Sequence, residues 1–378
     1  MISHLSRFVA VVYLAAVSLG AIASGSHFTG VAKIVAVGDL HGDYEQYVRI
    51  LKTNRLVDNK LKWVGGEVHF VQLGDVTDRG PDSLKIIRHL MKLEKQAKRA
   101  GGRVHVLIGN HEAMNIQTDL RYVHPGEYSV LVTKRSAKNQ SQYLEAVYSA
   151  MLVGKPEIAD IKEETFAKLE TSFPLGYVEH RRLWEPGQEL ARWYSKHNAV
   201  IQINDTIFLH GGLDPHVETF TALDEINETI RRELSPGGVA NLSTNARGPL
   251  WYRGLADEPQ EIELAAIENM LAHYDARRIV IAHTTTPGAI MTRFDRRVIL
   301  ADVGISAHYG GSLANVIIDE GAVFTIHRGK QLGLPDDAGL KEYLLQVAKL
   351  EPEGSKLKLY VDALNSPPPV QVVIEGAQ

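Results

Sequence analysis

Metal-ligating and acid–base side chains follow five short apolar runs of the chain. The runs at residues 31–37, 70–73 and 104–108 lead into three motifs, Gly38-Asp39-Leu40-His41-Gly42, Gly74-Asp75-Val76-Thr77-Asp78-Arg79-Gly80 and Gly109-Asn110-His111-Glu112. Two later runs, 207–209 and 279–282, end in His210 and His283. Because sites in open α/β sheets gather beyond the carboxyl ends of strands, we expect the five groups to converge on one place.

These side chains predict a centre with two divalent metal ions. Carboxylate, amide and imidazole ligands without sulfur suit manganese, iron, zinc or cobalt, of which we expect manganese to serve in vitro. Three histidines, two aspartates and an asparagine exceed what one tetrahedral site uses. We expect one ion at Asp39, His41 and Asp75. The second is expected at Asp75, Asn110, His210 and His283, with Asp75 as the bridge. Since Asp39 and His41 are two residues apart, an extended backbone would point both to one side.

Four further side chains are expected to act beside the ions. His111 is adjacent to a predicted ligand but free to donate a proton, and Asp78 can hold its ring and keep it protonated. Arg79 and Arg253 carry planar guanidinium groups that match phosphate oxygens. Glu112 is expected only to cap the helix that follows Asn110.

Strand and helix patterns alternate along the chain, which predicts an α/β fold. The apolar runs, which include one at 298–301, are separated by amphipathic stretches such as residues 83–100 and 259–273. Residues 113–198 interrupt the alternation with charge-rich helical patterns. We interpret them as a helical insertion, either a solvated cap or a lid that shapes substrate access.

Domain boundaries follow from the same patterns. We expect a catalytic domain over residues 29–335 and a peripheral C-terminal extension over residues 336–378. This extension is predicted to contain a helix at 337–350 and a short strand at 357–361.

The first 23 residues read as a secretory signal peptide. Arg7 precedes an apolar run at 8–17, and Ala21-Ile22-Ala23 provides a small-x-small cleavage site. The alternative is an uncleaved membrane anchor, because the run is only somewhat shorter than a bilayer span of about 20 residues. We expect cleavage after Ala23, export to the periplasm or the extracellular space, and no stable membrane insertion afterwards.

Composition excludes several other classes of protein. The chain has 378 residues, with 41 Lys plus Arg against 45 Asp plus Glu and a formal charge of -4, so no net basic field favours nucleic acid. Cysteine is absent, which excludes disulfide frameworks, thiolate zinc sites, iron–sulfur clusters and cysteine nucleophiles. The sequence leaves the oligomeric state open.

Taken in order, the motifs resemble those of the phosphoprotein phosphatase family of metallophosphatases. The resemblance covers about residues 33–330 apart from the insertion. It extends to His210-Gly211-Gly212-Leu213-Asp214-Pro215, to His283, and to Tyr309, which resembles the family's tyrosine near the phosphate. The implied fold is a four-layer, calcineurin-like α/β fold, a β-sandwich flanked by helices. The neighbouring His308 is left with either a structural or a functional role.

The long interval between Asn110 and His210, the context of Arg253 and the export signal look like the Shewanella-like subfamily, whose members favour phosphotyrosine. The resemblance implies a dinuclear-metal phosphomonoesterase that acts on phosphoproteins or phosphopeptides. A metal-bridging hydroxide would attack phosphorus directly. Two alternatives stay open. One is a diadenosine polyphosphate hydrolase, whose family shares the metal core and a run similar to residues 79–82. The other is a non-catalytic metal- or phosphate-binding protein.

Overall fold

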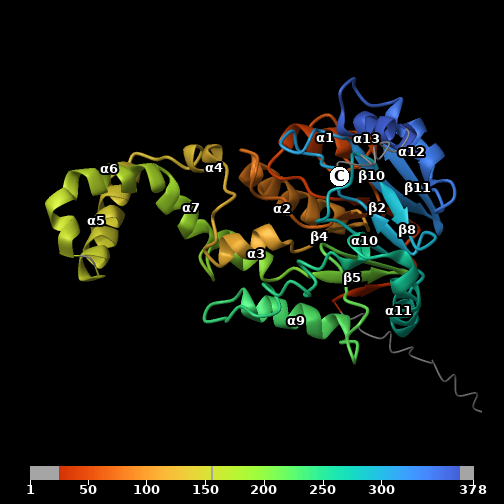
Figure 1. The fold of residues 1–378 in the computed structure, drawn as a ribbon, viewed down its shortest axis with the longest axis horizontal. Helices are drawn as coiled ribbons and strands as arrows, with labels where there is room; N and C mark the ends of the chain where they lie inside the picture. Colours follow the sequence, from red (N-terminus) through yellow and green to blue (C-terminus); the bar gives the residue numbers. More distant parts are fainter. Residues whose placement is uncertain (1–24, 155, 367–378) are drawn as a thin grey trace, which may run out of the picture.

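The computed structural model describes residues 25–154 and 156–366, in which two six-stranded sheets pack against each other (Figure 1). The first sheet has, in spatial order, β1 (His27–Phe28), β5 (Val200–Ile203), β6 (Thr206–Leu209), β7 (Arg278–Ile281), β9 (Val298–Leu300) and β8 (Met291–Arg293). The second has β12 (Lys330–Gly333), β11 (Ala322–His327), β10 (Ala314–Asp319), β2 (Lys33–Val37), β3 (His69–Gln72) and β4 (Arg103–Val106). The predicted signal peptide, residues 1–23, lies outside the described residues.

Alternation along the strands explains why the first sheet is covered on both faces. In β6, Phe208 packs into the core between the sheets, whereas Ile207 and Leu209 pack into a second core on the other side. Successive strand side chains point to opposite faces, so a strand of consecutive apolar residues needs a cover on each side. That second core also contains Ile226 of α9 (Leu223–Glu233) and Ile267 of α11 (Gln260–His273).

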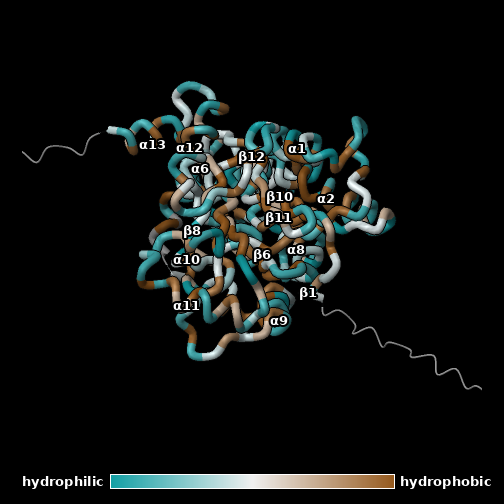
Figure 2. The backbone as a smooth tube through the Cα atoms, turned by 90° about the vertical axis from the view of Figure 1, so that its right-hand side faces the viewer, coloured by the Kyte–Doolittle hydropathy of each residue, from teal (hydrophilic) through white to brown (hydrophobic). Residues whose placement is uncertain are grey.

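The helices supply the outer layers. Figure 1 shows α9 and α11 on the outer side of the first sheet, and α1 (Tyr44–Thr53) and α2 (Ser83–Arg99) with the second. The short α10 (Gly254–Asp257) precedes α11. Together with the two sheets they form the predicted four-layer fold, which is confirmed. Figure 2 shows apolar residues concentrated along the central strands and polar residues along the outer loops.

The interval between β4 and β5 is helical, as the charge pattern predicts. It contains α3 (Asn110–Ile116), α4 (Pro125–Ser129), α5 (Ser136–Gly154), a 3-10 helix (Pro156–Ile161), α6 (Lys162–Ser172), α7 (Tyr177–Trp184) and α8 (Glu189–Tyr194). Figure 1 shows α5 and α6 projecting away from the sheets as an arm. The arm has a small apolar cluster of its own, which includes Leu144, Tyr148 and Leu169.

The strand expected at 357–361 is wrong, because this segment forms α13 (Lys356–Asn365) after α12 (Leu340–Ala348). Ser355 caps the helix by accepting a hydrogen bond from the N–H of Lys358 at 3.3 Å. Leu357 and Val361, four residues apart, bury one helical face against Ala289. Within residues 25–154 and 156–366, no helix is both long and apolar enough to span a bilayer.

Candidate active site

The predicted metal ligands lie at the carboxyl ends of five strands. Asp39 and His41 follow β2, Asp75 follows β3, Asn110 begins α3 after β4, and His210 and His283 follow β6 and β7. The strands β2, β3 and β4 are parallel neighbours, as are β6 and β7, so each set ends at one edge of its sheet. Packing of the sheets joins the two edges, because the backbone N–H of His283 lies 3.4 Å from Oδ1 of Asp39.

Asp75 is shared by two groups of potential ligand atoms. Those of Asp75, His41 and His111 lie within 4.8 Å of one another, and so do those of Asp75, His210 and His283. Oδ2 of Asp75 is 3.8 Å from Nε2 of His41 and 3.3 Å from Nε2 of His210. One buried carboxylate therefore faces histidines of both sheets, which is the arrangement that a carboxylate bridging two ions requires.

Backbone carbonyls fix the tautomers of two of these histidines. Nδ1 of His41 donates to the carbonyl of Thr77 at 2.8 Å, and Nδ1 of His210 donates to the carbonyl of Leu73 at 3.0 Å. Nε2 is therefore the atom of each ring that faces the site, and it can bind a metal once the proton on it is displaced. Nε2 of His210 lies 2.9 Å from Oδ1 of Asn110 and 3.1 Å from Nδ1 of His283. This donor set of oxygen and imidazole nitrogen fits two divalent ions.

The carboxylates of the site favour positive charge in their midst. Burial disfavours the charged form of His41, but Asp39 and Asp75 outweigh burial and raise its pKa to about 10. Burial likewise opposes ionisation of Asp75, yet His210 and His111 hold the pKa of its carboxyl well below the usual range. Burial, followed by the charges of His210 and Arg253, lowers the pKa of His283 to about 2. A neutral His283 imidazole is the form that can bind a metal.

Several site residues have left-handed backbone conformations. The φ angles are 42° for His41, 55° for Asp75, 68° for Asp78, 66° for Arg79 and 64° for His283. Non-glycine residues rarely adopt positive φ, and clusters of them are typical of functional sites. The extended backbone expected over Asp39 and His41 is therefore wrong at His41. A left-handed turn at His41 brings its Nε2 to 3.6 Å from Oδ2 of Asp39.

His111 and Asp78 form the expected pair. Nδ1 of His111 lies 2.6 Å from Oδ2 of Asp78, and Nε2 lies 3.8 Å from Oδ2 of Asp75. Asn115, which the sequence analysis did not single out, donates from Nδ2 to Oδ1 of Asp78 and to the carbonyl of His111, both at 2.9 Å. Its position one helical turn after His111 is the only sequence signal for this role.

Glu112 does more than the helix capping expected of it. Its buried carboxylate accepts hydrogen bonds from the backbone N–H groups of Asp75, Val76, Thr77 and Gly109, and from the hydroxyl of Thr77. It therefore joins the start of α3 to the loop after β3, which carries the shared aspartate. The spacing of the motifs gave no signal for this contact.

The remaining predicted residues lie around this centre. The Tyr309 ring centroid is 5.1 Å from that of His41. Arg253 donates from one guanidinium nitrogen to the carbonyl of His283 at 2.8 Å and to the hydroxyl of Thr284 at 3.0 Å. The guanidinium carbon of Arg79 lies 3.9 Å from the centroid of the Tyr122 ring. Tyr122 was missed by the sequence analysis, and its ring is 5.1 Å from that of His111.

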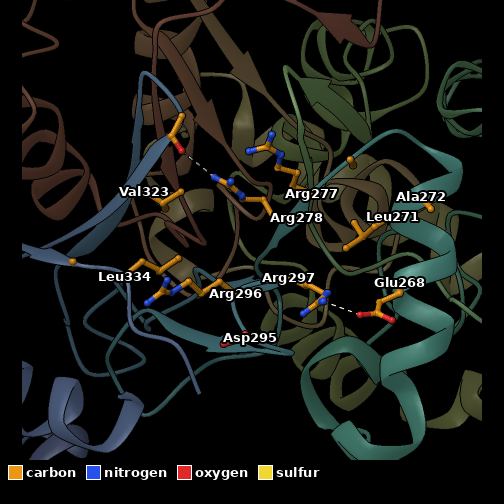
Figure 3. A pocket seen from close by; sticks show the side chains of 13 residues that line it. Glu268, Leu271, Ala272, Arg277, Arg278, Asp295, Arg296, Arg297, Val323 and Leu334 are labelled. Atoms are coloured by element: carbon orange, nitrogen blue, oxygen red, sulfur yellow. Dashed lines mark hydrogen bonds and ion pairs between the residues drawn. The ribbon is translucent and has the colours of Figure 1, made fainter. Parts of the chain in front are cut away.

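A separate cavity of about 770 Å³ contains none of these residues (Figure 3). It lies where β7 and β9 begin, whereas the candidate site lies beyond strand ends. Its walls include Arg277, Arg278, Arg296 and Arg297, the last paired with Glu268 at 2.7 Å. The candidate active site is therefore identified by its potential metal ligands, and this cavity is not part of it.

Known proteins share both the sequence pattern and the fold. The sequence profile of the calcineurin-like phosphoesterases matches residues 32–287. Shewanella-like protein phosphatase 2 of Arabidopsis thaliana is 31% identical over 75% of this chain and 74% of its own length. Shewanella-like protein phosphatase 1 of Plasmodium berghei is 26% identical over 75% and 71%.

A solved structure gives the same picture. The crystal structure of a cold-active protein-tyrosine phosphatase of a psychrophilic Shewanella species matches with a TM-score of 0.62 and 25% identity, covering 82% of both chains. With the profile match over residues 32–287 and the plant relative, this likeness shows that the chain belongs to the calcineurin-like phosphoesterase family and resembles its Shewanella-like protein phosphatases.

Proposed function

We propose that the protein is a protein phosphatase with a preference for phosphotyrosine, which hydrolyses the phosphate ester in one displacement without a covalent phosphoenzyme. The observation that carries the proposal is the shared Asp75, with His41 and His111 on one side and His210 and His283 on the other. A phosphate placed there would meet ligands, a proton donor and guanidinium groups at once.

Two divalent ions fit the donor set. Asp39, His41 and Asp75 would hold one, and Asp75, Asn110, His210 and His283 would hold the other. When bound, such ions supply Lewis acidity and activate water at neutral pH. Manganese is the metal we propose for activity in vitro.

The chain's own residues supply the proton and the phosphate contacts. His111 would protonate the departing ester oxygen through Nε2, while Asp78, hydrogen-bonded to Nδ1 at 2.6 Å, orients the ring. Arg79 and Arg253 would bind the non-bridging phosphate oxygens, on which negative charge accumulates in the transition state. Nε of Arg79 is buried without a hydrogen-bond partner among the described residues, so a phosphate oxygen would satisfy it.

The preference for phosphotyrosine rests on two supports. The similar Shewanella enzyme is named a protein-tyrosine phosphatase. In addition, the partly exposed rings of Tyr122 and Tyr309 lie beside His111 and His41, where an aryl leaving group would contact them.

The test is a set of initial rates on matched phosphotyrosine, phosphoserine and phosphothreonine peptides and on diadenosine tetraphosphate. Metal-stripped protein is assayed before and after addition of manganese, zinc, iron or cobalt. We expect metal-dependent phosphate release that is fastest from phosphotyrosine. Equal rates on all three peptides would remove the tyrosine preference, faster cleavage of the dinucleotide would favour the polyphosphate hydrolase, and no turnover with two metals bound would favour a binding protein.

We also propose that the protein is exported, on the strength of the N-terminal sequence alone. Sequencing of the mature N-terminus should begin at Ser24, and fractionation should recover the protein outside the cytoplasm. A cytoplasmic protein that retains Met1 would contradict this.

A further inference from the structure

The first turn of α13 lies against the loop that carries Tyr309. A Cβ added to Gly310 would lie 3.7 Å from Cδ of Lys356, which is the first residue of α13. Leu357 anchors the helix in the apolar cluster with Ala289, six residues after the predicted ligand His283. The C-terminal extension therefore brings a cation to the edge of the candidate active site.

Nothing within the described residues explains that cation as a stabilising charge. Lys356 is exposed and forms no ion pair in this part of the chain, whereas Lys358 pairs with Glu353 and Arg328 with Glu351. A lysine at a helix N-terminus opposes the helix dipole, so its place does not favour the helix either.

Cationic side chains lie near the histidine that precedes Tyr309. His308, exposed and next to Tyr309, has its ring centroid 4.8 Å from the tyrosine ring. Burial lowers the pKa of His308, and the charges of Arg79, His41, Lys356 and His124 lower it further. His308 thus lies among cations that include both a proposed phosphate-binding arginine and the lysine of α13.

We infer that Lys356 determines substrate specificity by binding the carboxylate of an acidic residue beside the phosphorylated tyrosine. The substrate class is an acidic phosphopeptide. Arg79 and Arg253 bind the phosphate. Lys356, which lies beyond the Tyr309 loop, forms an ion pair with a glutamate or aspartate next to the phosphorylated tyrosine. The inference rests on the proposed function, because it concerns the peptide that surrounds the hydrolysed phosphate.

The test compares two phosphotyrosine peptides that differ only in having glutamate or glutamine next to the phosphorylated residue. If Lys356 forms an exposed ion pair with the glutamate, the wild type should have an about threefold higher kcat/KM for the glutamate peptide at low salt. The difference should come from a lower KM for that peptide, with kcat unchanged. The preference should fade near 1 M salt, where the Debye length is about 3 Å. In Lys356→Gln the ratio should approach one, and in Lys356→Arg it should persist.

Lys358→Gln is the matched control. Lys358 lies in the same helical turn as Lys356, but its ammonium group is already paired with the carboxylate of Glu353. Its glutamate-to-glutamine ratio should equal that of the wild type. A wild-type ratio of one would overturn the inference, and so would a ratio that is the same in Lys356→Gln as in the wild type. In either case, metal-dependent hydrolysis of both peptides would still support the proposed function. Absence of metal-dependent hydrolysis of either peptide, and of p-nitrophenyl phosphate, would instead refute the proposed function.

Discussion

His111 is held in one orientation by the side chains of Asp78 and Asn115. Asp78 accepts from Nδ1, and Asn115 fixes Asp78 and the backbone of His111. The imidazole Nε2 is therefore directed at the shared aspartate, 3.8 Å away. Such positioning favours proton transfer from Nε2 to a leaving group. The gain in rate from this transfer is larger for a more basic leaving group.

We predict that His111→Asn damages phosphoserine hydrolysis more than aryl phosphate hydrolysis. An alkoxide needs a proton as it leaves, whereas a phenolate, whose conjugate acid has a pKa of about 10, depends on it less. We expect a loss of about 100-fold in kcat for a phosphoserine peptide and about tenfold or less for p-nitrophenyl phosphate. Equal losses on both substrates, at unchanged metal content, would contradict the assignment.

Tyr122 supports Arg79 through its ring face and its carbonyl. The guanidinium carbon is 3.9 Å from the ring centroid, and the backbone N–H of Arg79 donates to the backbone carbonyl of Tyr122 at 3.0 Å. A cation over an aromatic face is held by the ring quadrupole. Tyr122 is thus a positioning residue for a proposed phosphate-binding group.

We predict that Tyr122→Leu raises KM for p-nitrophenyl phosphate about fivefold, because Arg79 loses the ring that holds it. The inhibition constant of inorganic phosphate should rise in parallel. Tyr122→Phe keeps the ring face and should retain both values. If the leucine and phenylalanine variants behave alike, the ring does not hold Arg79.

At the scale of elements, α3 and the loop after β3 are joined by one carboxylate. Glu112 accepts four backbone N–H groups and a hydroxyl from these two segments, and its side chain is fully buried. Burial, and then the charge of Asp75, raise the pKa of Glu112. Hydrogen bonds from the backbone N–H groups of Gly109 and Asp75 have the opposite effect on this pKa, because they stabilise the ionised carboxylate of Glu112.

We predict that Glu112→Gln lowers the free energy of unfolding by about 2 kcal/mol, because the amide nitrogen faces N–H donors instead of accepting from them. Metal affinity should fall about 10-fold or more, since the loop carries Asp75. Urea unfolding and metal titration measure the two effects. The exposed Glu163→Gln on α6 serves as control and should change neither quantity.

The arm is the element least connected to this machinery. Its cluster of Leu144, Tyr148, Ile158 and Leu169 shares no residue with the core between the sheets. Whether the insertion at residues 113–198 is a cap or a lid stays a prediction. Its first part lies at the candidate site, because Tyr122 is in the loop between α3 and α4 and its ring is 5.1 Å from that of His111.

At the scale of the whole molecule, the predicted metal ligands come from both sheets. Asp39, Asp75 and Asn110 follow strands of the second sheet, and His210 and His283 follow strands of the first. Ligands that bind the folded chain but not the unfolded chain stabilise it by mass action.

We therefore predict that removal of metal by a chelator lowers the melting temperature by several degrees, and that added manganese restores it. A 100-fold excess of free metal over its Kd corresponds to about 2.7 kcal/mol. Asp75→Asn should abolish most of the manganese-dependent shift. A melting temperature that is insensitive to both chelator and manganese would exclude the proposed sites.

Acid should destabilise the fold because the buried imidazole of His327 takes up a proton when the chain unfolds. Burial, and then the charge of Arg328, lower its pKa to about 3, and its Nδ1 is buried without a partner among the described residues. The unfolded imidazole, with a pKa near 6.5, binds a proton first as the pH falls. The stabilisation is thus complete above pH 6.5 and declines as the pH approaches 3.

For this one group the loss amounts to about 2 kcal/mol between pH 7 and pH 5. We predict that His327→Gln flattens the decline in the free energy of unfolding over this interval, as measured by urea unfolding of metal-stripped protein. The exposed His273→Gln should keep the wild-type slope. An unchanged slope in His327→Gln would show that other groups govern the acid response.

Much of the fold was predictable because strand ends and ligands are adjacent in sequence. The apolar runs before Asp39, Asp75 and His210 became β2, β3 and β6, and the motifs alone indicated both the four-layer fold and the family. The exception at 357–361 has a physical cause. A short apolar segment does not reveal its period, and only the cap at Ser355 and the packing of Leu357 against Ala289 made it helical.

The sequence by itself determined which side chains could do chemistry, because each ligand type is encoded next to the strand that presents it. The tertiary structure decided which remote groups hold and surround them. The contacts of Glu112 with the Asp75 loop, of Arg79 with Tyr122, and of Lys356 with the Tyr309 loop join segments whose separation in the chain carries no pattern. Such contacts depend on which faces bury together, and burial is a property of the whole folded chain.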